Sequence, residues 1–239
     1  MNRLFKIALP ALCLLGACSG DTHTAGVTRG DTVSKTSATI PAQKLSDFVP
    51  EGYVLFDSVM GDLNKDNVRD YALIIKGTQQ SQFVKSDQGE MIDRNRRGLV
   101  ILFGSANGYH EVLSNKECFS SENEDGGVYF APELSVEISK GNLVVGYAHG
   151  RYGFWSYTFR YQEPDFELIG FDASDNRGPV VETETSINFL TGKKQVKVNT
   201  NENAEGEDEV FKETWSSIKS KEKIRLSKVE DFDSLELPR

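Results

Sequence analysis

Basic residues are in short supply in this chain. Its 239 residues include 27 Lys and Arg against 36 Asp and Glu, which gives a formal net charge of -9 at pH 7. Nucleic acids and anionic lipid surfaces attract proteins through clusters of basic side chains. The composition therefore predicts that the protein has no nucleic-acid partner, and it suits a soluble domain or one that binds divalent cations.

The sequence also lacks the usual signatures of catalysis. It contains three histidines, and no nucleophile elbow, phosphate-binding loop or neighbouring pair of cysteines accompanies them. The segment Ala148–Trp155 stands out because it combines His149 and Arg151 with glycines and aromatic residues. With the acids of Glu122–Asp125 it would form an acid/base site, although a turn between strands explains the same residues. We expect no catalytic residues, and an envelope hydrolase is the alternative.

Cysteines are equally scarce, which excludes a disulfide framework within the domain. The chain has three, Cys13, Cys18 and Cys118. The first two belong to an N-terminal signal and its processing site, as argued below, so Cys118 has no partner within the chain. We expect Cys118 to be a small buried residue and not a nucleophile.

No apolar run is long enough to span a bilayer, which takes about 20 residues. The N-terminal stretch Ile7–Leu15 is short, is interrupted by Pro10 and follows the basic residues Arg3 and Lys6. A charged start, a short apolar core and small residues at the end are typical of a secretory signal. The sequence therefore predicts export from the cytoplasm.

The signal ends in Leu-Gly-Ala followed by Cys18, and this tetrad resembles the lipobox of bacterial lipoproteins. In that class the signal, here residues 1–17, is removed and the cysteine carries acyl chains, palmitate among them. Several chains hold a protein stably on a membrane. The resemblance implies lipidation of Cys18, and Ser19 in place of Asp implies the outer membrane. An ordinary secretory signal with an unrelated cysteine is the alternative.

Between the signal and the folded part lies a segment with almost no bulky apolar residues. Residues 18–43 are rich in Ser, Thr, Gly and Ala, and such a composition cannot bury enough surface to fold. We predict a flexible tether there. The remaining residues, 44–239, have the length of one domain.

Apolar and polar residues alternate over short segments of this domain, with turn residues between them. The aromatics of Trp155–Tyr161 recur at every second position, and an Asn-Gly pair between two apolar runs is a strong hairpin signal. The pattern predicts an all-β antiparallel meander with little helix. We expect the aromatics in the core, with a carbohydrate platform as the alternative. Leu45–Phe48 and Phe211–Ile218 are helix candidates, the second equally a strand, and Gly77–Arg97 is predicted to be a mobile loop.

One loop carries a regular pattern of oxygen donors. In Asp62–Asp70, side-chain oxygens occupy loop positions 1, 3, 5 and 9, and the backbone carbonyl at position 7 offers another ligand. Calcium takes about six to eight oxygen ligands of this mixed kind. Neighbouring carboxylates repel one another, and a dication converts that repulsion into attraction. The predicted calcium ligands are Asp62, Asn64, Asp66, the carbonyl of Val68, and Asp70.

This loop is not an EF-hand. Leu73 stands at the twelfth position, where a bidentate glutamate is required, and Asn67 replaces the glycine of the sixth position. Asn tolerates the left-handed backbone that a sharp turn needs, so the turn survives the replacement. A β-like segment follows the loop directly. A plain turn held by Asx side chains, without a metal, is the alternative.

The loop and its flanks resemble the FG-GAP/VCBS repeats of integrin-type β-propellers and of secreted bacterial proteins. Gly61–Ile75 matches the Asp-x-Asn-x-Asp-Gly-x-x-Asp loop and first strand of that family, and Leu99–Tyr109 resembles its second strand and Gly-rich turn. The resemblance implies that the five ligands named above hold calcium. The chain has no second copy of the loop, whereas a propeller needs about four to eight blades. We expect a strongly twisted meander, or a packing of two sheets, that contains one propeller-blade-like unit and is not a closed propeller.

Together these features predict a lipid-anchored protein of the bacterial cell envelope, held in the outer membrane through Cys18. Calcium is expected to be structural, because the loop offers no obvious open coordination position for catalysis. The domain is expected to be a binding or structural module for an envelope protein or a glycan. Besides the envelope hydrolase, the alternative is a periplasmic immunity or inhibitor lipoprotein whose acidic surface neutralises a basic toxin.

Overall fold

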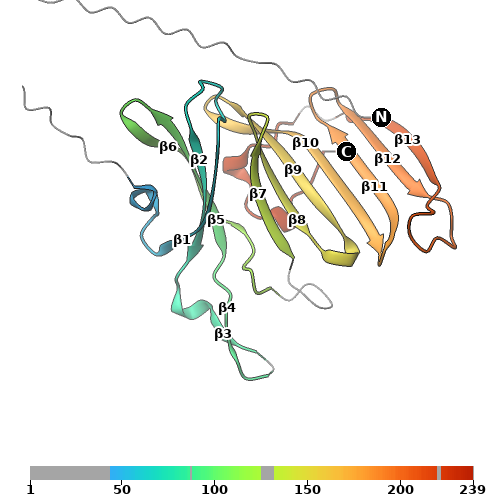
Figure 1. The fold of residues 1–239 in the computed structure, drawn as a ribbon, viewed down its shortest axis with the longest axis horizontal. Coiled ribbons are helices and arrows are strands. Elements are labelled where there is room, and N and C mark those ends of the chain that lie inside the picture. Colours follow the sequence, from blue (N-terminus) through green and yellow to red (C-terminus); the bar gives the residue numbers. More distant parts are fainter. Residues whose placement is uncertain (1–43, 87, 125–131, 220–221, 239) are drawn as a thin grey trace, which may run out of the picture. The chain divides into compact units, whose positions relative to one another are not determined.

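The computed structural model describes residues 44–86, 88–124, 132–219 and 222–238. Its strands form a four-stranded sheet, a seven-stranded sheet and a two-stranded hairpin (Figure 1). All pairings between these strands are antiparallel. None of the described sheets closes on itself. The prediction of an all-β antiparallel meander is confirmed.

The strands and short 3-10 turns follow the chain in a simple order. The four-stranded sheet has the order β1-β2-β5-β6, made of β1 Tyr53–Gly61, β2 Asp70–Gly77, β5 Arg97–Ser105 and β6 Gly108–Phe119. The seven-stranded sheet runs in sequence order from β7 to β13: β7 Glu133–Ser139, β8 Asn142–Ala148, β9 Gly153–Gln162, β10 Asp165–Arg177, β11 Val180–Asn188, β12 Lys193–Asn199 and β13 Phe211–Ser217. The hairpin consists of β3 Phe83–Lys85 and β4 Met91–Asp93. The 3-10 turns are η1 Leu45–Phe48, η2 Gln80–Gln82, η3 Gly150–Tyr152, η4 Leu226–Lys228 and η5 Phe232–Ser234.

The two large sheets share one hydrophobic core. Leu99 and Ile101 of β5 lie in this core with Val145 of β8, and all three side chains are fully buried. The alternate residues of β5, Val100 and Leu102, pack on the opposite face of the four-stranded sheet against the segment that contains η1. Since both faces of β5 are covered, the strand is apolar without interruption and does not alternate.

The C-terminal segment completes the core, which the sequence pattern did not indicate. Asn115 of β6 donates both bonds of its side-chain amide to this segment, to the carbonyls of Leu226 at 3.0 Å and Val229 at 2.7 Å. Phe232 is 1% exposed and stacks on Phe119 of β6 with 5.2 Å between ring centroids. The segment thus packs against residues of both sheets and belongs to the same core.

The segment Gly77–Arg97, which the sequence predicts to be a mobile loop between two strands, contains regular structure of its own. It contains η2 and the β3–β4 hairpin, and its end is buried. Asn95, 1% exposed, accepts the backbone N–H of Gln79 at 2.8 Å and donates to the Asp93 carboxylate at 2.7 Å. Local polar side chains satisfy backbone groups here, so a polar sequence becomes ordered without an apolar core of its own.

The two helix candidates have different outcomes. Leu45–Phe48 forms the 3-10 turn η1, whereas Phe211–Ile218 contributes the edge strand β13, which ends at Ser217. Among the described residues, no helix has the length and apolar character needed to cross a bilayer.

Candidate functional site

The predicted calcium loop joins β1 to β2, which begins at Asp70. Two of its residues have left-handed backbone, Lys65 with φ of 66° and Asn67 with φ of 65°. The sharp turn expected at Asn67 is confirmed, because Asn is one of the few residues that adopt this conformation readily. The left-handed Lys65 was not foreseen from the sequence.

Side-chain oxygens of the loop point back at its own backbone. Asp62 Oδ1 accepts the N–H groups of Lys65 at 2.7 Å and Asp66 at 3.2 Å, and Oδ2 accepts that of Asn67 at 3.0 Å. Asn64 Oδ1 accepts the N–H of Asp66 at 3.0 Å. These bonds satisfy the backbone donors of the turn and give the loop a defined shape.

Asp70 ties the loop to the sheet. Its side chain is fully buried, and its carboxylate accepts the N–H of Leu63 at 2.7 Å and that of Gly104 in β5 at 3.0 Å. A Cβ on Gly104 would lie 2.3 Å from the Arg69 carbonyl oxygen, so this close approach requires glycine. Burial raises the pKa of the Asp70 carboxyl, backbone hydrogen bonds lower it in part, and the nearby Asp66 raises it further.

The donor set of the loop fits calcium in chemistry and in spacing along the chain. In its spatial arrangement it differs from a formed metal centre, because the described residues hold no group of three or more His, Cys, Asp and Glu that could hold a metal ion. Asp66 Oδ1 accepts the Val68 N–H at 2.7 Å, and its Oδ2 accepts the Asn64 amide at 2.9 Å. The oxygens that accept these N–H groups keep further lone pairs, which a cation can coordinate without loss of the hydrogen bonds.

The acids near Glu122 belong to an ion-pair network that the sequence did not reveal. Lys76 of β2 is 8% exposed and pairs with Asp93 at 2.6 Å and with Glu122, while Glu124 pairs with Arg94 at 2.9 Å. Burial by itself would lower the pKa of the Lys76 ammonium. The hydrogen bonds and negative charges of Asp93 and Glu122 have the larger opposite effect, so the pKa is raised. The one available signal was a lysine directly after the apolar run of β2. Asp125 lies outside the described residues.

His149 lies in an open hollow of about 520 Å³ lined mainly by aromatic side chains. The lining residues are His149, Tyr152, Phe154, Trp155, Phe171, Ala173, Ser174, Asp175 and Thr185. This set includes neither Arg151 nor Glu122, so the proposed members of an acid/base site do not meet in it. Within the aromatic stripe, Tyr157 is buried in the core as predicted, whereas Trp155 is only half-buried and reaches the hollow.

Cys118 is a free, fully buried cysteine, as the sequence predicts. Its Sγ donates a weak hydrogen bond to the Asn115 carbonyl at 3.6 Å. Burial raises the pKa of the thiol to about 12. At neutral pH the side chain is therefore a protonated thiol, which is a poor nucleophile.

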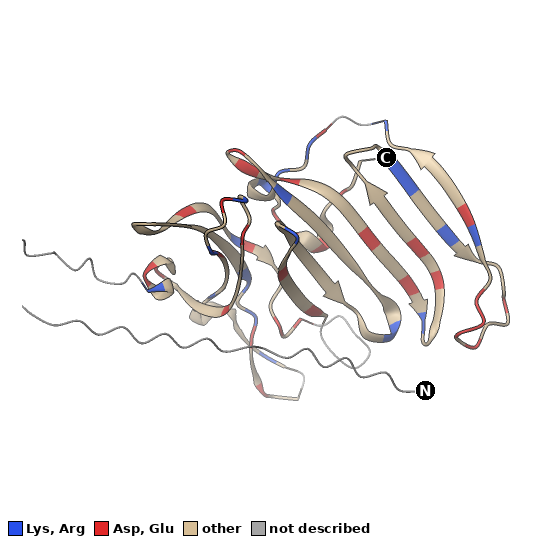
Figure 2. Ribbon diagram, turned by 45° about the horizontal axis from the view of Figure 1, so that its top comes forward, with Lys and Arg blue, Asp and Glu red and all other residues tan. Residues whose placement is uncertain are grey.

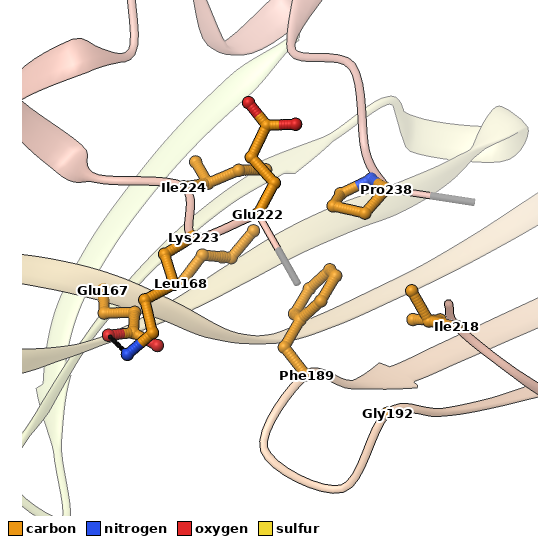
Figure 3. Close-up of a pocket in the computed structure, with 9 residues that line it drawn as sticks. All are labelled: Glu167, Leu168, Phe189, Gly192, Ile218, Glu222, Lys223, Ile224 and Pro238. Atoms are coloured by element: carbon orange, nitrogen blue, oxygen red, sulfur yellow. Dashed lines mark hydrogen bonds and ion pairs between the residues drawn. The ribbon is translucent and has the colours of Figure 1, made fainter. Parts of the chain in front are cut away.

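A smaller pocket lies where the C-terminal segment crosses the seven-stranded sheet (Figure 3). Its volume is about 110 Å³, and the side chains of Leu168, Phe189 and Ile218 surround it. Lys223 pairs with Glu167 at 3.0 Å at its edge. A space of this size holds a few water molecules at about 30 Å³ each. We interpret it as a packing seam between the segment and the sheet.

Comparisons with protein-family models, with curated proteins and with solved structures find no match to this chain. Cys18, the signal over residues 1–17 and the tether over residues 18–43 lie outside the described residues. Lipidation and membrane anchoring therefore stay predictions from the sequence.

Proposed function

We propose that the protein is a lipid-anchored module of the bacterial cell envelope whose β domain is stabilised by calcium and serves binding, not catalysis. The observation that carries the calcium part is Asp70. This carboxylate is fully buried, the interactions described for it include no basic side chain, and a second acid, Asp66, lies nearby. A buried negative charge is unfavourable without a compensating cation. Calcium in the adjoining loop would supply that compensation.

The predicted ligands would hold the ion at the junction of three strands. They are the side chains of Asp62, Asn64, Asp66 and Asp70 and the carbonyl of Val68. Asp70 already connects the loop to β5 through Gly104, so a cation that orders the loop would also stabilise the β1–β2–β5 arrangement. The four-stranded sheet that contains the loop has the size of one propeller blade, which supports the FG-GAP/VCBS resemblance.

Binding is favoured over catalysis by the placement of the reactive side chains. The Cys118 thiol is buried and protonated, and Glu122 and Glu124 are ion-pair partners. His149 lies apart from them, in a hollow whose lining is mostly aromatic. Such a lining suits contact with a ligand or a partner more than proton transfer.

The test is a thermal melt of the soluble domain in EGTA and in calcium, for wild type and for Asp66→Ala. Calcium at about 100 times its Kd adds about 2.7 kcal/mol to the free energy of unfolding. At about 2–4 °C per kcal/mol, the wild-type melting temperature should rise by several degrees. Asp66→Ala should remove most of that rise, and Asp172→Ala, which removes an exposed carboxylate of β10, should keep it. Identical melts in EGTA and in calcium for the wild type would overturn the proposal.

A further inference from the structure

One face of the seven-stranded sheet is covered only over part of its width. Residues directly opposite each other share a face, and pairing in register gives one continuous row across this sheet. The row consists of Leu134, Tyr147, Trp155, Ala173, Thr185, Val196 and Thr214. Tyr147 is 1% exposed in the shared core, Trp155 is half-buried, and every residue of β13 is exposed. The core-facing side of the sheet is therefore buried at β8, half-buried at Ala173, Thr185 and Val196, and exposed along β13.

The aromatic hollow lies at the boundary between the covered and the open part. The turn η3 forms one wall, and a hydrogen bond of 2.8 Å from the His149 N–H to the Gly153 carbonyl closes it. Gly153 has φ of 104°, and a Cβ there would lie 1.8 Å from the Ser174 carbonyl oxygen. Only glycine permits this approach of β9 to β10, which brings Tyr152 and Trp155 into the same hollow. The backbone therefore holds the aromatic wall in place before any ligand arrives.

The charge of the hollow is complementary to an organic cation. Asp175 is the one Asp, Glu, Lys or Arg among its lining residues, and it is an exposed carboxylate. The faces of Trp and Tyr rings attract ammonium and guanidinium groups, and a carboxylate adds a direct ion pair. Figure 2 shows further acidic positions in the loop that joins β12 to β13. Asp172 of β10 and Glu184 of β11 lie on the opposite face of the sheet, because they fall one position out of step with the row that contains Ala173 and Thr185. The whole chain carries a net charge of -9, which steers basic partners toward it.

We propose that this hollow binds an arginine or lysine side chain of a basic polypeptide partner, whose neighbouring residues lie along β11 and β12 beside the hollow. A second open hollow, of about 430 Å³, has Thr183, Val198 and Glu202 in its lining, together with the Arg177–Glu182 ion pair. Thr183 pairs with Asp175 of the first hollow on one side and with Val198 on the other, so the two hollows adjoin. A free small ammonium ion would occupy only the first, whereas a polypeptide segment uses both. The inference rests on the proposed binding role and not on calcium.

The experiment uses acetylated, amidated hexa-arginine as the probe and hexa-citrulline as its neutral counterpart of equal shape. Trp215→Phe leaves Trp155 as the one tryptophan of the chain, and Trp215 lies outside the hollow. Hexa-arginine should change the Trp155 fluorescence, and hexa-citrulline should not. Asp175→Asn should weaken hexa-arginine binding by about tenfold, which corresponds to losing one charge-assisted contact. Asp172→Asn, on the same strand and with the same change in net charge, should alter it by less than about twofold.

Three outcomes would overturn the inference. Equal weakening by the two carboxylate variants would mean that the probe responds only to net charge. Equal binding of hexa-citrulline would exclude recognition of a cation. Choline binding as tightly as hexa-arginine would assign the hollow to a small ammonium compound.

The calcium melt of the same samples separates the two proposals, because loss of peptide binding with an intact calcium response refutes only this one. Melting temperatures of both variants within a degree or so of the parent exclude misfolding as the cause.

Discussion

Single side chains determine how the predicted calcium loop is attached to the sheet. Both carboxylate oxygens of Asp70 accept backbone N–H groups, one from Leu63 in the loop and one from Gly104 in β5. The odd spacing of oxygen donors indicates Asp70 as a ligand, and the sequence contains nothing that indicates this second, structural role. The contact depends on Gly104, which lies 34 residues away in the chain.

Asp70→Asn should destabilise the domain even without metal. The amide keeps one acceptor oxygen and turns its NH₂ group toward a backbone donor, so a buried N–H loses its partner. That costs about 1–3 kcal/mol, or several degrees of melting temperature for a domain of this size. The measurement is a thermal melt in EGTA, with Asp172→Asn as the exposed control. A melting temperature equal to that of wild type would show that the two hydrogen bonds contribute nothing to stability.

Burial of Cys118 should make stability fall at alkaline pH. The pKa of its thiol is about 12 in the folded protein against an ordinary value of 9.0. A raised pKa in the folded state stabilises the fold below pH 9, and this contribution is lost as pH rises from 9 toward 12, because the unfolded thiol ionises first. Urea unfolding at pH 8, 9.5 and 10.5 should show the decline, and Cys118→Ala should flatten it. A slope unchanged in this variant would contradict the assignment, since the tyrosines whose pKa is raised, Tyr147 and Tyr157 among them, would then account for it.

At the scale of secondary structure, the C-terminal segment forms part of the core that the two sheets share. Its Phe232 packs within the shared core against rings of β6 and β9, at centroid distances of 5.2 Å from Phe119 and 5.5 Å from Tyr157. Asn115 of β6 fixes the preceding turn through two hydrogen bonds. A short segment without strands thus holds two sheets together, because its apolar side chains fill the space that the strands leave between them.

Phe232→Ala should therefore be among the most destabilising single changes in the chain. Truncating a fully buried phenylalanine costs about 3–5 kcal/mol, which lowers the melting temperature by roughly ten degrees for a domain of this length. Phe83→Ala, at a side chain 38% exposed on β3, is the matched control and should cost far less. The melts are recorded in the same buffer. Equal effects of the two variants would mean that the segment is not part of the cooperative core.

At the scale of the whole molecule, attachment to the membrane is the prediction that can be tested most directly. Lipidation of Cys18 should place the wild-type protein in the membrane fraction of a bacterial expression host. Cys18→Ala should release it, because the variant has no thiol to carry the acyl chains. Fractionation followed by immunoblotting measures both, with Cys118→Ala as the control that retains the anchor cysteine. A variant at position 18 that stays in the membrane fraction would refute the lipid anchor.

The sequence alone determines the class of the fold and the type of most of its elements. Apolar runs, alternating or continuous, with Asn, Gly and Pro between them are a local property, and the strands of both large sheets coincide with such runs. The left-handed turn at Asn67 and the burial of Cys118 were likewise predictable from residue type. The targeting signal is also purely local, and it stays a prediction from the sequence.

Contacts between residues far apart in the chain were decided only by the tertiary structure. The ordering of Gly77–Arg97, the filling of the core by the C-terminal segment and the Lys76 ion pairs all depend on such contacts. The aromatic hollow likewise depends on strand register, which places residues of η3, β9, β10 and β11 around one space. Periodicity along one strand says which side chains share a face. It does not say which strand lies beside it or how far the neighbouring sheet extends, because those are set by packing of the whole core.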